Sequence, residues 1–371
     1  MDSKLTGFTE VFEGKKVLIT GHTGFKGSWL GCWLKLLGAD VVGVSLGEVS
    51  HPSHYGLIGA DRIFSRSYEH DLRNPGLLKI LTDERPDFIF HLAAQALVGR
   101  SYSDPADTWL TNVGATISVL DSLRSVDWRC VAVFITSDKC YENKEWVWGY
   151  RETDELGGAD PYSSSKAACE LAISSYVRSF FSGPDVSVKI ASARAGNVIG
   201  GGDWAENRIV PDAVQSWNSG NILDIRNPLS TRPWQHVLEP LGGYLRLAEQ
   251  MFVGEQVHGE SFNFGPSGTS EHTVGEVVSR LSRSLPNLNW IVNDDALSGP
   301  MKESGLLKLD CDKAMRLLGW RSVLGFEPTI DLTADWYVRF FCKGEPAIEI
   351  TFDHICSYHP ALAKSFEGGM A

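Results

Sequence analysis

The chain has 371 residues, 43% of them hydrophobic and 22% charged, which is typical of a soluble globular protein with one or two domains. The formal net charge of −12 argues against nucleic acid or an anionic membrane as a general partner. The seven scattered cysteines form no C-x-x-C pair, and no apolar signal core or long apolar run is present. These features favour reduced thiols, no metal site and a cytoplasmic location.

The first elements along the chain predict a βαβ unit. Residues 16–20 form an apolar strand, 21–27 a glycine turn, 28–37 a helix closed by Gly38, and 39–44 a second strand. This order implies a parallel sheet with a right-handed crossover.

Three further apolar runs, at 87–92, 131–135 and 186–190, are separated by longer helical stretches. The alternation predicts an α/β fold with a Rossmann-like, doubly wound parallel sheet. After Arg194 the sequence becomes rich in glycine and arginine, but a helix at 237–252 and a strand at 261–265 are expected to return to the sheet. We therefore expect a sheet domain of residues 1–195 and 237–268.

The remaining residues, 196–236 and 269–371, are expected to form a smaller, interleaved C-terminal domain. Its last helix is predicted at 330–341, with Trp336 and Tyr337 on the apolar face. The final dozen or so residues end in Gly-Gly-Met-Ala and are expected to fray.

The glycine turn has the pattern G-x-x-G-x-x-G, with Gly21, Gly24 and Gly27 between a strand and a helix. Such a turn lets the backbone and the helix N-terminus approach a dinucleotide pyrophosphate. His22 and Lys26 either contact the pyrophosphate or ribose, or are solvated loop residues. Ser45-Leu46 replaces the usual acidic residue after the second strand, so the choice between NAD and NADP stays open.

Other candidate cofactor contacts follow the later strands, because ligands of such sheets lie at the carboxyl ends of the strands. Asp71 and Leu72 are candidates for the adenine edge. Small residues follow the strand at 87–92, where a dinucleotide passes closely; the candidates there are Leu92, Ala93, Ala94 and Gln95. Ala93 and Ala94 are alternatively packing residues.

Tyr162 and Lys166 lie four residues apart and therefore share one face of a predicted helix. The lysine charge favours the tyrosine phenolate, which makes Tyr162 a candidate base near neutral pH. Ser137, at the end of an apolar strand, is a candidate for holding the substrate oxygen. Alcohol oxidation does not need the acid–cation pair Asp138-Lys139 beside Ser137, so this pair indicates a second chemical step.

The glycine turn, His91-Leu92-Ala93-Ala94, Asn112, Ser137 and the Tyr162/Lys166 pair together resemble the extended short-chain dehydrogenase/reductase family over nearly the whole chain. Longer motifs at 136–141, 148–152, 194–204 and 230–237 resemble the family's CDP-glucose-specific 4,6-dehydratase branch. The resemblance implies an NAD-dependent lyase acting on CDP-D-glucose, on the route to dideoxysugars of lipopolysaccharide O-antigen. It adds Thr23, Phe25 and Asn112 to the cofactor contacts.

The resemblance also implies a mechanism: transient oxidation at C4, loss of water across C5 and C6, and return of the hydride to C6. Tyr162 would act at the C4 hydroxyl, and Asp138 is the candidate acid at C6; alternatively Asp138 caps the loop. Lys139 either removes the C5 proton in its neutral form, or stabilises the enolate in its charged form.

Substrate contacts are expected from Arg208, Arg232 and Asn197 at the diphosphate and from Arg100 and Ser101 at the sugar. Arg208 and Arg232 are alternatively surface ion-pair residues. Helices at 112–124 and 164–180 either pair across a two-fold axis, giving a homodimer or a dimer of dimers, or only cover the sheet. The alternative functions are a dTDP- or UDP-glucose dehydratase, a nucleotide-sugar 4-epimerase and a dinucleotide-sensing protein.

Overall fold

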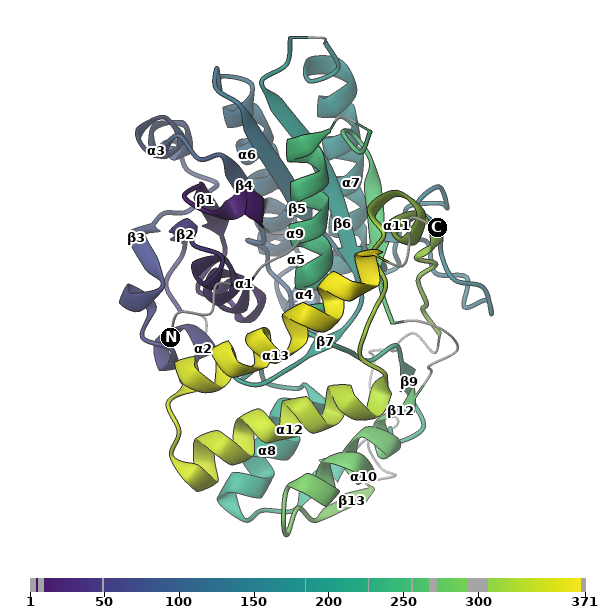
Figure 1. Cartoon of the computed structure of the whole chain (residues 1–371). Coiled ribbons are helices and arrows are strands. Elements are labelled where there is room, and N and C mark those ends of the chain that lie inside the picture. The colour runs from purple at the N-terminus through teal and green to yellow at the C-terminus, as the bar shows by residue number, and fades with distance from the viewer. Residues whose placement is uncertain are drawn as a thin grey trace.

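The computed structural model describes residues 5, 10–48, 50–183, 185–225, 227–254, 256–266, 272–292 and 306–367. Its centre is a seven-stranded parallel sheet with the order β11-β6-β5-β4-β1-β2-β3 (Figure 1). The strands are β1 (Lys16–Thr20), β2 (Asp40–Ser45), β3 (Phe64–Glu69), β4 (Phe88–His91), β5 (Cys130–Ile135), β6 (Val188–Ala195) and β11 (Ser261–Phe264). The predicted Rossmann-like fold is confirmed.

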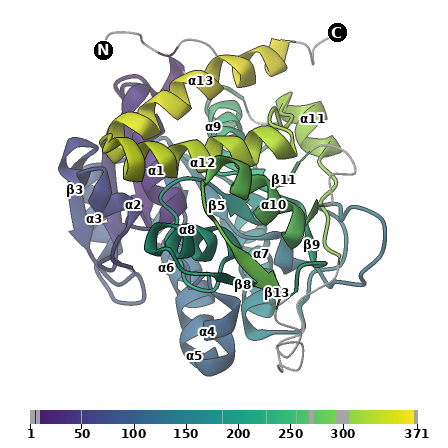
Figure 2. The same ribbon diagram turned by 90° about the horizontal axis from the view of Figure 1, so that it is seen from below.

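Helices cover both faces of this sheet, because alternate strand residues point to opposite sides. In β1, Val17 and Ile19 enter one hydrophobic core while Leu18 enters the other. The first face is covered by α1 (Phe25–Leu36) and α9 (Leu238–Val253); the second is covered by α3 (Leu77–Glu84), α6 (Ala115–Leu123) and α7 (Pro161–Phe180) (Figures 1 and 2).

A second region lies below the sheet in the view of Figure 1. It contains α8 (Ile209–Ser219), α10 (Val274–Ser284), α12 (Phe326–Lys343) and the strand pairs β8 (Leu223–Ile225) with β13 (Trp290–Val292) and β9 (Thr231–Arg232) with β12 (His272–Thr273). Between these segments α9 and β11 return to the main sheet. One core runs through both regions, from Val17 to Val278, so the domain boundaries given above stay a prediction.

Short elements complete the connections. They are β7 (Val198–Ile199) paired with β10 (Gln235–His236), the helices α2 (His54–Leu57), α4 (Val98–Ser103), α5 (Pro105–Trp109) and α11 (Asp312–Leu318), a π-helical turn at Leu110–Gly114, and 3-10 turns at Glu10–Phe12, Ala60–Arg62 and Asp138–Cys140.

The C-terminal segment differs from the prediction. The helix expected at 330–341 is part of α12, but α13 (Ala347–Glu367) follows it. The expected fraying of the last dozen residues is therefore wrong as far as Glu367, and residues 368–371 lie outside the described residues. The reason is burial: Ile350, Tyr358 and Leu362 belong to the core beside α1 and α9.

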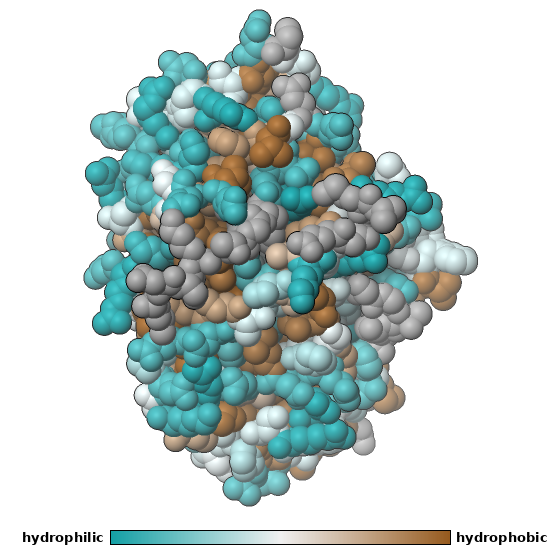
Figure 3. All heavy atoms as spheres, in the orientation of Figure 1, coloured by the Kyte–Doolittle hydropathy of each residue, from teal (hydrophilic) through white to brown (hydrophobic). Residues whose placement is uncertain are grey.

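Hydrophobic residues on the coloured surface of Figure 3 are scattered among hydrophilic ones. None of the helices in the described part of the chain is both long enough and apolar enough to cross a membrane.

A buried carboxylate fastens α13 to α9. Glu239, in the first turn of α9, is fully buried, and it accepts hydrogen bonds from the Val323 and Leu324 N–H groups (2.9 and 2.6 Å) and from the Tyr358 hydroxyl (2.8 Å). Burial raises the pKa of Glu239 to about 7, against the effect of these donors.

The unfolding free energy of the protein should therefore depend on this group. Because the pKa of Glu239 is raised on folding, the folded chain binds its proton more tightly, and stability declines as pH rises from about 4.5 to about 7. Replacing Glu239 by Gln should flatten this decline in denaturant titrations at pH 5 and 8. The exposed Glu206→Gln variant is the control. If the unfolding free energy changed equally with pH in the parent and in both variants, the assignment to Glu239 would be contradicted.

Candidate active site

The predicted site segments meet at the carboxyl edge of the sheet. The glycine turn follows β1, residues 92–95 follow β4, Ser137 follows β5, and Gly196 follows β6. Strands β1 and β4 are neighbours in space although β2 and β3 separate them in sequence. Such a switch point leaves a crevice in which open α/β sheets bind ligands.

The glycine turn fits a pyrophosphate. Gly21 has φ +74°, and a Cβ atom there would lie 2.7 Å from the Ala93 main-chain nitrogen. A methyl group on Gly27 would overlap the Gly21 carbonyl oxygen. Gly24 begins α1 without a side-chain cap, so the first N–H groups of the helix remain available to an anion.

His22 does not point into this cradle. It is buried, its Nε2 atom lies 3.2 Å from Ser67 Oγ, and its ring packs edge-on against Tyr55 and Phe64. Burial lowers the pKa of His22 to about 4, so the ring is neutral. His22 is therefore not the solvated loop residue that was one of its two predicted states, and its contact with the pyrophosphate or ribose stays a prediction.

The other side chains of the turn also contact protein. Thr23 Oγ1 lies 2.8 Å from Ser45 Oγ, which ties the turn to the end of β2, where the acidic residue of other dinucleotide sites would stand. Phe25 packs beside Gly200, whose added Cβ would lie 3.2 Å from the Phe25 ring.

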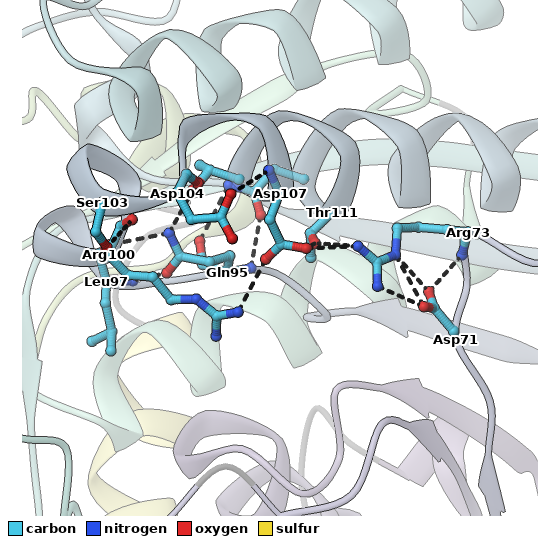
Figure 4. A network of polar contacts seen from close by, with 11 residues as sticks. Asp71, Arg73, Gln95, Leu97, Arg100, Ser103, Asp104, Asp107 and Thr111 are labelled. Atoms are coloured by element: carbon cyan, nitrogen blue, oxygen red, sulfur yellow. Dashed lines mark hydrogen bonds and ion pairs between the residues drawn. The ribbon is translucent and has the colours of Figure 1, made fainter.

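Asp71 and Arg100 lie in one ion-pair network (Figure 4). Arg73 donates to both carboxylate oxygens of Asp71 and reaches Asp107 Oδ1 at 2.7 Å, while Arg100 binds the other oxygen of Asp107 at 3.1 Å. Arg100 is thus paired with Asp107 of α5, a partner that the sequence did not predict. Arg73 holds the Asp71 carboxylate and lowers its pKa.

Neighbouring candidates are used inside the protein. Leu72 is a core residue, and the Ser101 hydroxyl donates to the Val98 carbonyl at 2.7 Å. Gln95 and Asn112 bind each other, since the Asn112 side chain accepts from the Gln95 N–H (2.8 Å) and donates to its carbonyl oxygen (3.2 Å). These side chains hold the loop after β4, whereas Leu92, Ala93 and Ala94 are partly exposed beside the glycine turn.

Ser137 and Asp138 lie together at the end of β5. The Ser137 hydroxyl donates to Asp138 Oδ1 at 2.9 Å, and both residues are buried. Burial raises the pKa of Asp138, although Lys139 and the Ser137 hydrogen bond oppose this. A Cβ atom on Gly196 would lie 3.0 Å from Asp138 Oδ2, so only glycine leaves this oxygen undisturbed.

Tyr162 and Lys166 occupy successive turns of α7, which Asp160 caps by accepting the Ser163 N–H at 2.9 Å. Burial raises the pKa of Tyr162 to about 12, while Ser137 and Arg208 lower it. Burial also lowers the pKa of Lys166. The shift of the phenol toward neutral pH that the sequence predicts is thus absent in the protein alone, in which burial outweighs the nearby positive charge.

Lys26, in the first turn of α1, interacts electrostatically with Asp138 and Lys166, which are both predicted to be catalytic. Burial lowers its pKa to about 8, Asp138 raises it, and Arg208 and Lys166 lower it further. A residue predicted at the pyrophosphate therefore also acts on the carboxylate predicted as the acid.

The predicted substrate residues lie after β6. Arg208 Nη1 donates to Asp203 Oδ2 at 3.0 Å. Arg232 lies in β9 and donates to the Thr231 carbonyl at 2.6 Å, and Asn197 is exposed directly after β6.

Sequence reasoning missed a buried ion pair behind the catalytic residues. Arg194 donates to Glu170 at 2.8 Å, and Glu170 also accepts from Thr136 and from Ser192, the latter at 2.8 Å. The pair joins β6, α7 and the segment before Ser137. The spacing of Lys166 and Glu170 could have indicated this pair, because Glu170 lies one helical turn beyond Lys166 and therefore on the same face of α7.

The matching family model is described as the NAD dependent epimerase/dehydratase family and covers residues 17–265. The chain belongs to this family. The glycine cradle and the uncapped start of α1 fit its cofactor, and the residues that would hold NAD are Gly21, Gly24, Gly27 and the segment 92–94.

Among known proteins, the chain is 40% identical to the CDP-glucose 4,6-dehydratase of Salmonella typhimurium, covering 95% of this chain and 98% of that protein. It is 25% identical to a probable dTDP-glucose 4,6-dehydratase of Sinorhizobium fredii, covering 87% and 93%. A solved epimerase of Methanothermobacter thermautotrophicus has a TM-score of 0.76 at 23% identity, covering 91% and 96% of the two chains, and supports the fold.

A Gly27→Ala variant tests the cradle. The added methyl group would overlap the Gly21 carbonyl, so we expect NAD affinity to fall at least tenfold, measured by calorimetric titration. Gly99→Ala is the control, because Gly99 is exposed in α4 and nothing lies within 4 Å of its Cβ position. Equal NAD affinity in both variants would show that the turn does not hold the cofactor.

Proposed function

We propose that this chain is a lyase that converts CDP-D-glucose to CDP-4-keto-6-deoxy-D-glucose and water. The observation that carries this proposal is the Asp138 carboxyl group, buried beside Ser137 with a raised pKa, next to the Tyr162/Lys166 pair. A protonated acid is required for eliminating the C6 hydroxyl, but not for alcohol oxidation alone. The 40% identity to a CDP-glucose 4,6-dehydratase supports the choice of substrate.

The proposed roles follow the positions of the side chains. Ser137 holds the C4 oxygen, and Tyr162 removes its proton. NAD, when bound, supplies the acceptor and later the donor of the hydride. Lys166 lies one turn from Tyr162 and orients the cofactor and phenol, while Asp138 protonates the departing C6 oxygen.

Lys139 is the proposed C5 residue. It follows Asp138 in the same 3-10 turn, and its backbone N–H is directed to Ser137 Oγ at 3.3 Å. Its side chain is partly exposed, which leaves it free to approach a sugar carbon. Its two proposed roles, as base or as charged stabiliser of the enolate, make different predictions.

Replacing Lys139 by Met distinguishes them. If Lys139 is the base, solvent deuterium entry at C5 should fall at least a hundredfold, as expected for loss of a positioned proton-transfer group. NMR of the product formed in D₂O measures this. Undiminished exchange rate at C5 would exclude Lys139 as the base. Lys144→Met, an exposed lysine paired with Glu155, is the matched control.

A nucleotide-sugar 4-epimerase is the alternative from another reaction class, since such enzymes share this fold and need no acid at C6. The proposal predicts that the purified protein with NAD forms a 4-keto-6-deoxy sugar from CDP-glucose, detected by its absorbance in alkali. It also predicts lower kcat/KM with dTDP- and UDP-glucose. A C4 epimer as the only product would contradict the lyase assignment.

We also propose a homodimer, or a dimer of dimers, assembled through α6 and α7 and working in the cytoplasm on a precursor of surface polysaccharide. Support comes from large apolar side chains that are exposed on α6, on α7 and on the π-helical turn before α6: Leu110 (61%), Ile117 (39%), Leu171 (61%) and Phe180 (48%). Exposed apolar side chains on neighbouring helices are expected at a subunit interface.

A further inference from the structure

We propose that Asp203 is a positioning residue for substrate binding: it holds Arg208 in the orientation in which the guanidinium group receives the diphosphate of the nucleotide sugar. This inference rests on the proposed function, because it concerns the same substrate. Asp203 belongs to the segment 200–204, Gly-Gly-Gly-Asp-Trp, which is part of a motif that carries the family resemblance but has no predicted chemical role.

The carboxylate is fixed on both oxygens. Asp203 is 4% exposed; its Oδ2 accepts from Arg208 Nη1 at 3.0 Å, and its Oδ1 accepts from the Ala205 N–H at 3.1 Å. The Arg208 side chain is 37% exposed. Within the described part of the chain this is the hydrogen bond that the Arg208 side chain makes, so its other guanidinium N–H groups remain available to phosphate oxygens.

Arg208 needs such a partner because of its place in the fold. It is the N-cap of α8, where the helix carries partial positive charge and disfavours a nearby cation. A long side chain at the surface also has many rotamers to lose on binding. The Asp203 carboxylate offsets the unfavourable charge and selects one direction for the guanidinium.

The Arg208 charge also acts on side chains of the proposed active site. The Arg208 charge lowers the pKa of Tyr162 and of Lys26, which lie on α7 and α1. The diphosphate is attached at C1 of the same sugar that is proposed to react at C4, so a cation that acts on the Tyr162 phenol is suited to receive it.

The backbone that carries Asp203 is itself held by both regions of the protein. The Tyr337 hydroxyl of α12 donates to the Asp203 carbonyl at 2.8 Å, and the Trp29 indole of α1 donates to the Gly201 carbonyl at 2.9 Å. A Cβ atom on Gly201 would overlap Trp336. The carboxylate thus has a rigid support, which a positioning residue requires.

Asp203 could act on phosphate binding in two ways, and removing its charge would change the affinity in opposite directions in the two cases. If Asp203 mainly neutralised Arg208, its removal would strengthen the attraction for phosphate. If it positions Arg208, its removal should weaken binding. Calorimetric titration of CDP into the NAD-loaded protein should show affinity about tenfold lower for Asp203→Asn, with partial recovery in Asp203→Glu. Unchanged or tighter CDP binding in Asp203→Asn would overturn the proposal.

A double-mutant cycle separates positioning from a general structural defect. Arg208→Ala should also weaken CDP binding, and Asp203→Asn should add no further loss in that background. Additive losses would overturn the proposal. Arg208→Lys keeps the charge but not the planar fork, so it too should lose affinity, and wild-type affinity in this variant would contradict the geometry. For Asp203→Asn, KM for CDP-glucose should rise by a larger factor than kcat falls.

Glu206→Gln is the matched control, because it removes the same charge from an exposed position in the same segment and should bind CDP as the parent does. Loss of CDP binding in this control would overturn the proposal, since charge alone would explain the effect. A parent protein that neither binds CDP nor converts CDP-glucose would refute the proposed function. A parent that does both, with an unimpaired Asp203→Asn variant, would refute only the role of Asp203.

Discussion

Burial of ionisable groups at the carboxyl edge of the sheet is the constraint on which the rest of this site depends. Burial raises the pKa of Asp138 and of Tyr162 and lowers the pKa of Lys166 and Lys26. All these shifts favour the neutral form of the group. A neutral carboxyl group is useful as an acid, whereas a neutral phenol is a poor base. In the proposed mechanism, the buried site therefore favours the acid form of Asp138, whereas the Tyr162 phenolate would need added positive charge to form.

These groups are buried because several loops and one helix meet at the same edge of the sheet. Loops after β1, β5 and β6 bring the first turn of α1, the Ser137–Asp138 pair and Gly196 to one point, and α7 adds the Tyr162 phenol from the side. Behind them, the ion pair of Arg194 and Glu170 joins β6 to α7 within the core. Removing either partner of a buried ion pair destabilises a protein strongly. The pair therefore holds α7 in a fixed position against β6.

Sequence patterns predicted the parts of the structure that are governed by local periodicity. The first strand has the predicted bounds, Lys16–Thr20, and Tyr162 and Lys166 share a helix. β3 was not predicted because it is an edge strand, exposed along most of its length and poor in apolar residues. α13 was overlooked because the polar chain end obscured a buried apolar face at Ile350, Ile355 and Leu362.

Contacts between side chains that are far apart in the sequence could not be predicted from such patterns. Residue type alone does not show that Arg73 holds the Asp71 carboxylate, that Asp107 binds Arg100, or that His22 packs under β2. These choices depend on which neighbours the sheet order brings together. The same limit applied to Asp203, whose relation to Arg208 depends on how α1 and α12 hold the segment between them.

The central claim is that the C4 hydrogen of the sugar is removed and returned at C6 within one active site. Conversion of CDP-glucose deuterated at C4, followed by NMR of the product, tests this claim most directly. The account predicts that the deuterium appears in the C6 methyl group of the 4-keto-6-deoxy product. Deuterium retained at C4, or lost entirely to solvent, would contradict it.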